Sequence, residues 1–238
     1  GLRPDAVVLV TTTRALKLHG GAGKQSLMEP DLAALTAGID NLKKHIENIH
    51  HFRLPVVVVI NRFTRDADEE IAVIQNKCAY LNVPIVSADH WARGGQGAED
   101  LARHVIDAAE NTKNDFTLLY DDDMPLWNKV RTIALKIYGA NDILADKKLR
   151  EKFKEYDNLG YGRFPVCMAK TQYSLSTDPA LKGRPQNFDV PVRDINVAAG
   201  AEFVVVYLGD ILTMPGLPKR PAAESIDIDD NGLVKGLV

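Results

Sequence analysis

The stretch LPVVVVINRF, residues 54–63, decides the fold. Its five consecutive β-branched residues, 56–60, indicate a strand buried on both faces, because a strand with one solvated face would alternate apolar and polar residues. The strand runs directly into Asn61, Arg62 and Phe63, which places an aromatic ring just past its last buried residue. A strand of this kind predicts a parallel sheet that is covered by helices on both sides.

The neighbouring segments repeat an alternation of strand and helix. Residues 5–12 (DAVVLVTT) and 84–87 (PIVS) are short apolar runs typical of strands. Residues 31–50, 67–81 and 98–109 carry apolar side chains at three- and four-residue spacing, which is typical of amphipathic helices. The first 115 residues therefore predict an α/β fold, a parallel sheet with flanking helices of the P-loop NTPase-like or Rossmann-like kind.

The pattern changes after residue 115, and the rest predicts a smaller α+β subdomain. A helix is expected from Pro125 to Tyr138, with the three aspartates 121–123 as its N-cap and dipole partner rather than as a metal site. A charged helix is expected over 147–156, and a hairpin around Asn231 and Gly232. Strands are expected over 164–170, 190–197 and 202–208. These patterns place a boundary near residues 115–140, so that 121–238 would be the C-terminal subdomain.

The composition and charge of the chain indicate which kinds of binding partner to expect. The chain has 238 residues, a formal net charge of -3 and a pI near 6.1, so electrostatics favours neither nucleic acid nor an anionic membrane. No apolar run approaches the roughly 20 residues that span a bilayer, and no signal peptide is predicted. Cys78 and Cys167 are too few for a disulfide framework or a zinc site and are expected in the core. We therefore expect a cytoplasmic protein that binds small molecules.

Two aromatic residues follow consecutive strands of the predicted sheet. Phe63 comes after the 56–60 strand and Trp91 after the 84–87 strand. Ligands of parallel sheets lie beyond the carboxyl ends of the strands, so the two rings could face a planar heterocycle from opposite sides. The alternative is that both rings cap the hydrophobic core.

The segment Gly20-Gly21-Ala22-Gly23-Lys24 only superficially resembles a phosphate-binding loop. A P-loop needs Gly five residues before its Gly-Lys pair and Ser or Thr directly after the Lys, but Leu18 and Gln25 stand there. We expect no Walker-type role for this segment. The residues alone predict neither a set of catalytic side chains nor a metal site.

Four longer stretches resemble the formate-tetrahydrofolate ligase family. They are VTTTRALKLHGG at 10–21, LPVVVVINRF at 54–63, LGYGRFPVCMAKTQYSLSTDP at 159–179 and MPGLPKRPAAESIDID at 214–229. Thr11 and Thr13 stand where the family more often has Ala and Val or Ile, and FVVVYLGDI at 203–211 departs from its usual pattern. The resemblance spans nearly the whole chain.

The resemblance implies a ligase that uses MgATP to convert formate into formyl phosphate and then formylates N10 of tetrahydrofolate, with a possible monovalent cation requirement. It implies that Phe63 and Trp91 hold the pterin ring. It also implies a homotetramer and a P-loop in an N-terminal portion that nothing in this sequence matches. The chain then resembles the C-terminal part of the enzyme and is expected to be inactive alone. Residues 1–50 would end a nucleotide-binding domain and 51–120 would bind folate.

The resemblance adds candidates for the nucleotide or phosphate side of the site. Arg14, Lys17 and His19 follow the first predicted strand, although they could equally be a structural helix start. Asn61 could orient a ligand amide or bond the loop backbone. Residues 170–172 (Lys170, Thr171 and Gln172) lie in a family motif without an assigned role. Residues 92–97 (ARGGQG) could bind an anion before a helix N-terminus or form an ordinary flexible turn. The alternatives for the whole chain are a nucleotide-binding module that reads a base with NRFTRD, residues 61–66, or a noncatalytic assembly module.

Overall fold

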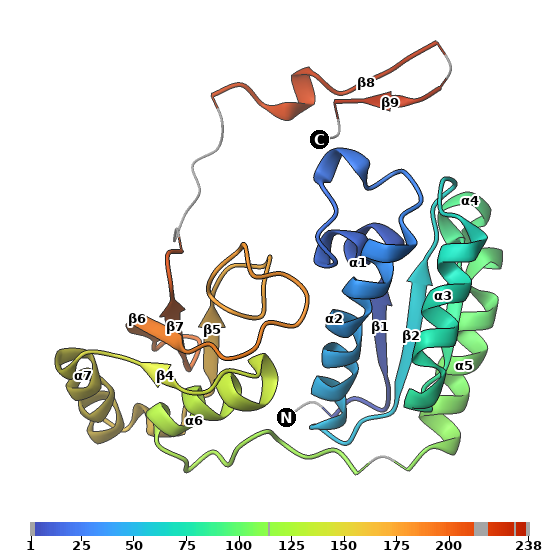
Figure 1. Ribbon diagram of the computed structural model, residues 1–238. Coiled ribbons are helices and arrows are strands. Elements are labelled where there is room, and N and C mark those ends of the chain that lie inside the picture. The colour runs from blue at the N-terminus through green and yellow to red at the C-terminus, as the bar shows by residue number, and fades with distance from the viewer. Residues whose placement is uncertain (1–2, 114, 212–218, 231, 237–238) are drawn as a thin grey trace.

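The computed structural model describes residues 3–113, 115–211, 219–230 and 232–236. These residues form an N-terminal unit (residues 3–113) and a C-terminal unit (residues 115–211), each built on its own sheet. Figure 1 shows the two units side by side, joined by an extended segment that follows helix α5.

The sheet of the N-terminal unit is parallel and has the order β1-β2-β3. Strand β2 (Val56–Asn61) is the middle strand, paired with β1 (Val7–Thr11) and with β3 (Ile85–Ala88). Its first five residues are all buried, as the LPVVVVINRF stretch predicts. The predicted α/β fold with a parallel sheet and flanking helices is confirmed.

Helices cover both faces of this sheet. One core joins β2 to α1 (Thr13–His19), α2 (Leu32–His50) and α3 (Asp68–Cys78), and the other joins β2 and β3 to α5 (Glu99–Asn111). The second face is covered only in part. Val8 and Val10 of β1 pair in register with buried residues of β2 but are 39% and 60% exposed. Strand β1 therefore presents an apolar surface that α5 does not cover.

Helices α1 and α2 cross with their backbones in close approach. A Cβ atom placed on Gly20 would lie 1.7 Å from the carbonyl oxygen of Ala34, and one on Gly38 would lie 1.8 Å from that of Leu16. Only glycine fits at such a crossing. Gly20, the first residue of the GGAGK segment, thus has a packing role.

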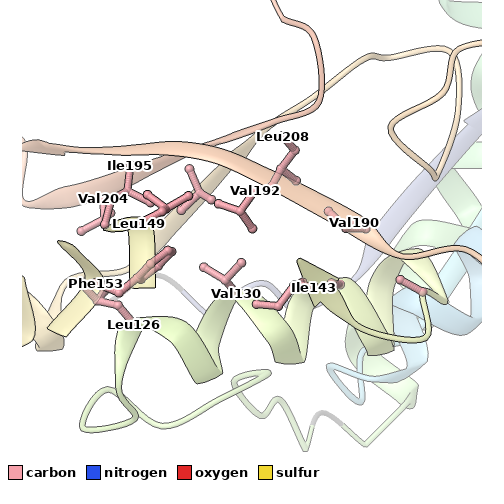
Figure 2. Packing of buried hydrophobic residues seen from close by; sticks show 13 residues of the cluster. Leu126, Val130, Ile143, Leu149, Phe153, Val190, Val192, Ile195, Val204 and Leu208 are labelled. Atoms are coloured by element: carbon pink, nitrogen blue, oxygen red, sulfur yellow. The ribbon is translucent and has the colours of Figure 1, made fainter. Parts of the chain in front are cut away.

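The C-terminal unit has a mixed four-stranded sheet of order β4-β6-β7-β5. Strands β6 (Val190–Ala198) and β7 (Phe203–Leu208) are antiparallel, whereas the short strands β4 (Ile143–Leu144) and β5 (Val166–Ala169) run parallel to their neighbours. Figure 2 shows side chains of β6 and β7 packed against α6 (Leu126–Ile133) and α7 (Lys147–Asn158). This mixed sheet stands where the sequence predicts an α+β subdomain.

The remaining elements are short. Strands β8 (Asp227–Ile228) and β9 (Val234–Lys235) form the predicted hairpin, and Asn231 lies outside the described residues. The π-helical turn η4 (Ala134–Tyr138) continues α6. No helix among the described residues is long and apolar enough to cross a membrane. The other short helices are η1 (Lys24–Ser26), η2 (Ala79–Leu81), α4 (His90–Arg93), η3 (Gly94–Ala98), η5 (Tyr161–Arg163) and η6 (Ala222–Glu224).

Two sequence predictions about the C-terminal unit are wrong. The aspartates at 121–123 do not cap α6, because Pro125 occupies the N-cap position and the Leu126 amide donates to Asp157 instead, at 3.1 Å. Cys167 is exposed rather than buried, since it lies on an edge strand. Cys78 is fully buried, as predicted.

Helix α2 connects the two units by three polar contacts. The ammonium group of Lys44 donates to the Lys136 carbonyl at 2.7 Å, and the Asn41 amide donates to the Gly183 carbonyl at 2.8 Å. The Arg184 guanidinium binds both carboxylate oxygens of Glu47 at 2.7 Å. The contacts of Gly183 and Arg184 fix the irregular segment 170–184 against the N-terminal unit, and the Lys136 contact does the same for η4.

Candidate functional site

Three loops leave the carboxyl edge of the parallel sheet next to one another. Asn61, the last residue of β2, pairs in register with Ala88, the last residue of β3, and the Arg62 amide donates to the Ala88 carbonyl at 2.9 Å. Thr11 at the end of β1 pairs with Ile60. The segments that carry Arg14, Phe63 and Trp91 therefore start from one edge, where parallel sheets bind ligands.

The loop that carries Phe63 is held by a buried carboxylate. Asp66, which is 7% exposed, accepts hydrogen bonds from the Phe63 amide at 2.9 Å and from the Thr13 hydroxyl at 2.7 Å. It thereby ties the loop to the first turn of α1. The Arg14 guanidinium lies 4.6 Å from the centre of the half-buried Phe63 ring. This cation covers one face of the ring.

Trp91 lies in the short helix α4, and the connection from β3 through α4 to η3 is closed on itself. The Asp89 amide donates to the Gly97 carbonyl at 3.2 Å, and the Arg93 guanidinium pairs with the Asp89 carboxylate at 2.9 Å. A Cβ atom on Gly97 would lie 2.6 Å from a carboxylate oxygen of Asp89, so glycine is required for this closure. Trp91 itself is 70% exposed. It does not cap the core, which was the alternative interpretation.

Two buried polar atoms at this edge have no hydrogen-bond partner among the described residues. They are Nε of Arg14 and Oδ1 of Asn61. Most buried polar side-chain atoms in proteins are hydrogen-bonded, so an unsatisfied donor and acceptor beside Phe63 indicate a place for a polar ligand or for ordered water.

The other two candidates from the first helix lie elsewhere. Lys17 is 2% exposed and makes an ion pair with Glu70 at 2.9 Å, and it donates to the Glu29 carbonyl at 2.8 Å. Its geometry is that of a structural residue. His19 lies at the far end of α1, where its Nδ1 accepts from the Gly183 amide at 3.1 Å. Burial lowers the pKa of His19, and the nearby charge of Lys182 lowers it further.

Sequence reasoning missed Asp66. The signal was present in the NRFTRD segment, because an Asp three residues after a loop aromatic can accept that residue's amide in a turn. Among the described residues, no cluster of three or more His, Cys, Asp or Glu side chains could hold a metal ion.

This geometry defines a class of protein, an α/β unit whose candidate site lies at the carboxyl edge of a parallel sheet. A family model described as formate-tetrahydrofolate ligase matches residues 1–238. The chain belongs to this family.

Three relatives show the extent of the similarity. The formate-tetrahydrofolate ligases of Granulibacter bethesdensis, Methylococcus capsulatus and Allorhizobium ampelinum are 52%, 53% and 51% identical to this chain over its whole length. The aligned part makes up only 41%, 42% and 43% of those three proteins, in the same order. The chain thus spans less than half the length of the curated relatives that it matches.

Proposed function

We propose that this chain is the folate-binding part of an ATP-dependent ligase that formylates tetrahydrofolate at N10 from formate through formyl phosphate. The carrying observation is that Phe63 and Trp91 stand on neighbouring loops at one sheet edge, with Trp91 70% exposed. An exposed Trp and a half-buried Phe that follow neighbouring strands would suit a flat heterocycle bound between the two rings.

The unpartnered atoms beside Phe63 support a pterin as this heterocycle. Its amide oxygen would accept from Nε of Arg14, and its amino group would donate to Oδ1 of Asn61, the two buried atoms that have no partner in the described residues. Stacking would contribute about 0.5–1.5 kcal/mol for each ring beyond area burial. Asp66 would act as a positioning residue, because it fixes the loop that carries Phe63.

Phosphoryl transfer would depend on the part of the family protein that lies outside this chain. Formyl phosphate formation needs groups that neutralise the charge of MgATP, and the GGAGK segment lacks the P-loop spacing. Strand β1 is an edge strand of the described sheet, which would let a nucleotide-binding portion of P-loop NTPase-like or Rossmann-like type continue the sheet there, and its exposed valines leave a face for that portion to cover. A cytoplasmic homotetramer and a monovalent cation requirement belong to the same proposal.

The proposed parts 1–50, 51–120 and 121–238 would then differ in the ligands that they contact. Residues 1–50 share a sheet and a core with 51–120, so ligand contacts rather than packing would separate the nucleotide side from the folate side.

Calorimetric titration of the chain with tetrahydrofolate tests this proposal. We expect saturable binding that Phe63→Ala and Trp91→Ala each weaken at least tenfold. Tyr173→Ala, which removes a 44% exposed ring from the C-terminal unit, should bind like the parent chain. ATP binding without folate binding would instead favour a nucleotide-binding module, and self-association without either ligand would favour an assembly module. We expect no release of phosphate from formate and ATP by this chain alone.

A further inference from the structure

A cavity of about 210 Å³ lies where segment 170–184 meets helices α1 and α2. It is far larger than the roughly 30 Å³ that one water molecule occupies in the liquid. The N-terminal unit contributes His19, Asn41 and His45 to its wall, and the C-terminal unit contributes the rest. The remaining lining residues are Tyr138, Lys170, Thr171, Gln172, Ser174 and Leu175.

The ionisable groups that line this cavity are two imidazoles, one ammonium group and one phenol, with no carboxylate among them. Burial lowers the pKa of Lys170 to about 8. Burial also lowers the pKa of His45, and the charges of His19, Lys44 and Lys170 act in the same direction. Burial raises the pKa of Tyr138 to about 12, so its hydroxyl stays protonated. An anion in the cavity would relieve the mutual repulsion of the bases.

Two of the three basic side chains, Lys170 and His19, are held in place by backbone groups. The Lys170 ammonium donates to the carbonyl of Thr171 at 2.8 Å and to the carbonyl of Ser174, which leaves the third of its three protons. Nδ1 of His19 accepts from the Gly183 amide, so the neutral ring carries its proton on Nε2 and can donate from there. No hydrogen bond to the described residues occupies the His45 ring.

We propose that this cavity binds a small oxyanion, a phosphate or a short carboxylate, between the two units, with Lys170, His45 and Nε2 of His19 as donors. Lys170 and His19 are held by backbone groups, and the His45 ring nitrogens have no hydrogen-bond partner among the described residues. No carboxylate lines the cavity, so an oxyanion there would accept charge-assisted hydrogen bonds. The cavity does not include the aromatic edge, because none of its lining residues is Arg14, Asn61, Phe63 or Trp91, although a neighbouring hollow that shares His19, Asn41 and His45 extends to Thr11 and Thr12. It does not depend on the proposed folate function. A bound anion would add contacts from one ligand to both units and so strengthen their association.

Thermal unfolding of the chain in inorganic phosphate tests the proposal, with KCl used to keep the ionic strength constant. We expect Tm to rise by about 4 °C when phosphate is in tenfold excess over its Kd. A parallel titration with acetate distinguishes the two oxyanions, because a response to acetate alone identifies a carboxylate site. If neither anion raises Tm, the proposal is overturned.

Variants then locate the site. Lys170→Met and His45→Gln should each weaken phosphate binding at least tenfold, while Lys170→Arg keeps the charge and should retain most of it. Lys154→Met, at an exposed position of α7, is the matched control and should leave binding unchanged.

The parent chain provides a test that needs no substitution. Phosphate should shift the imidazole NMR signals of His45 and His19 more than those of His50, which lies exposed at the end of α2. Equal shifts of all these signals, or an unchanged phosphate response in Lys170→Met, would contradict the assignment.

Discussion

The two units treat buried polar groups in different ways. In the C-terminal unit the fully buried Lys129 donates to the carbonyl oxygens of Gly162 and Phe164, at 2.8 and 3.1 Å. In the N-terminal unit Nε of Arg14 and Oδ1 of Asn61 are buried without a partner among the described residues. Both atoms lie at the carboxyl edge of the parallel sheet. A third such atom, Oδ1 of Asn48, lies in α2, whereas the buried Lys17 of the same unit has partners as Lys129 does. The difference between the units is therefore a donor and an acceptor left unpaired at the sheet edge.

The largest expected effect comes from the close crossing of α1 and α2. Gly20→Ala should destabilise the N-terminal unit by more than about 4 kcal/mol, because its new methyl group would overlap the Ala34 backbone. Gly200→Ala in the C-terminal unit meets no atom within 4 Å and should cost less than about 0.5 kcal/mol. Hydrogen exchange followed by mass spectrometry, which reports on β2 and β7 separately, measures both. Equal protection of β2 in the two variants would refute the packing role of Gly20.

The buried ion pair between Lys17 and Glu70 comes next. Glu70→Gln should cost about 3 kcal/mol, because it leaves the Lys17 ammonium buried without its counter-charge. Adding Lys17→Met to this variant removes the uncompensated charge and should restore part of the loss. The free energy of unfolding of the single and the double variant, measured by urea titration, tests both expectations. A double variant that is less stable than Glu70→Gln would show that Lys17 contributes mainly through its bond to the Glu29 carbonyl.

Asp66 links stability to the proposed ligand site. Asp66→Ala should cost about 2 kcal/mol, because two hydrogen bonds to a buried carboxylate are lost, and should weaken tetrahydrofolate binding about tenfold by releasing the Phe63 loop. Asp142 in the C-terminal unit also accepts two hydrogen bonds but is 48% exposed, so Asp142→Ala should cost less than about 1 kcal/mol and leave binding unchanged. Calorimetry and urea unfolding of both variants test this difference. If Asp66→Ala binds tetrahydrofolate as tightly as the parent chain, Asp66 does not position the Phe63 loop for the ligand.

A smaller effect concerns Lys170 at the boundary between the units. Burial lowers its pKa from 10.5 to about 8, so between these values the unfolded chain holds a proton that the folded chain has lost. Stability therefore rises with pH through this window, and the cost of the charged form is fully present below about pH 8. The free energy of unfolding of the parent chain, relative to Lys170→Met, should increase from pH 8 to pH 10. A constant difference over this range would show that the folded-state pKa is not lowered.

The sequence predicts the N-terminal unit well because its strands are continuous apolar runs. Five consecutive apolar residues in β2 predict a strand buried on both faces of a parallel sheet. The order of the neighbouring strands then predicts which connections lie at the same edge of that sheet. The roles of Lys17 and Gly20 could not be predicted, because an ion pair with Glu70 and a contact with Ala34 depend on how helices pack. The prediction that the aspartates at 121–123 cap α6 is wrong, because the residue that accepts from the Leu126 amide, Asp157, is distant in sequence and no local pattern reveals it.

The central claim is that Phe63 and Trp91 enclose a flat ligand at the edge of the parallel sheet. The most direct test is the fluorescence of Trp91 in a Trp127→Phe background, where it is the only Trp, during titration with tetrahydrofolate. We predict saturable quenching that is lost when Phe63→Ala is added while β2 stays protected from hydrogen exchange. Quenching that persists in Phe63→Ala, or no quenching in a folded Trp127→Phe chain, would contradict this account.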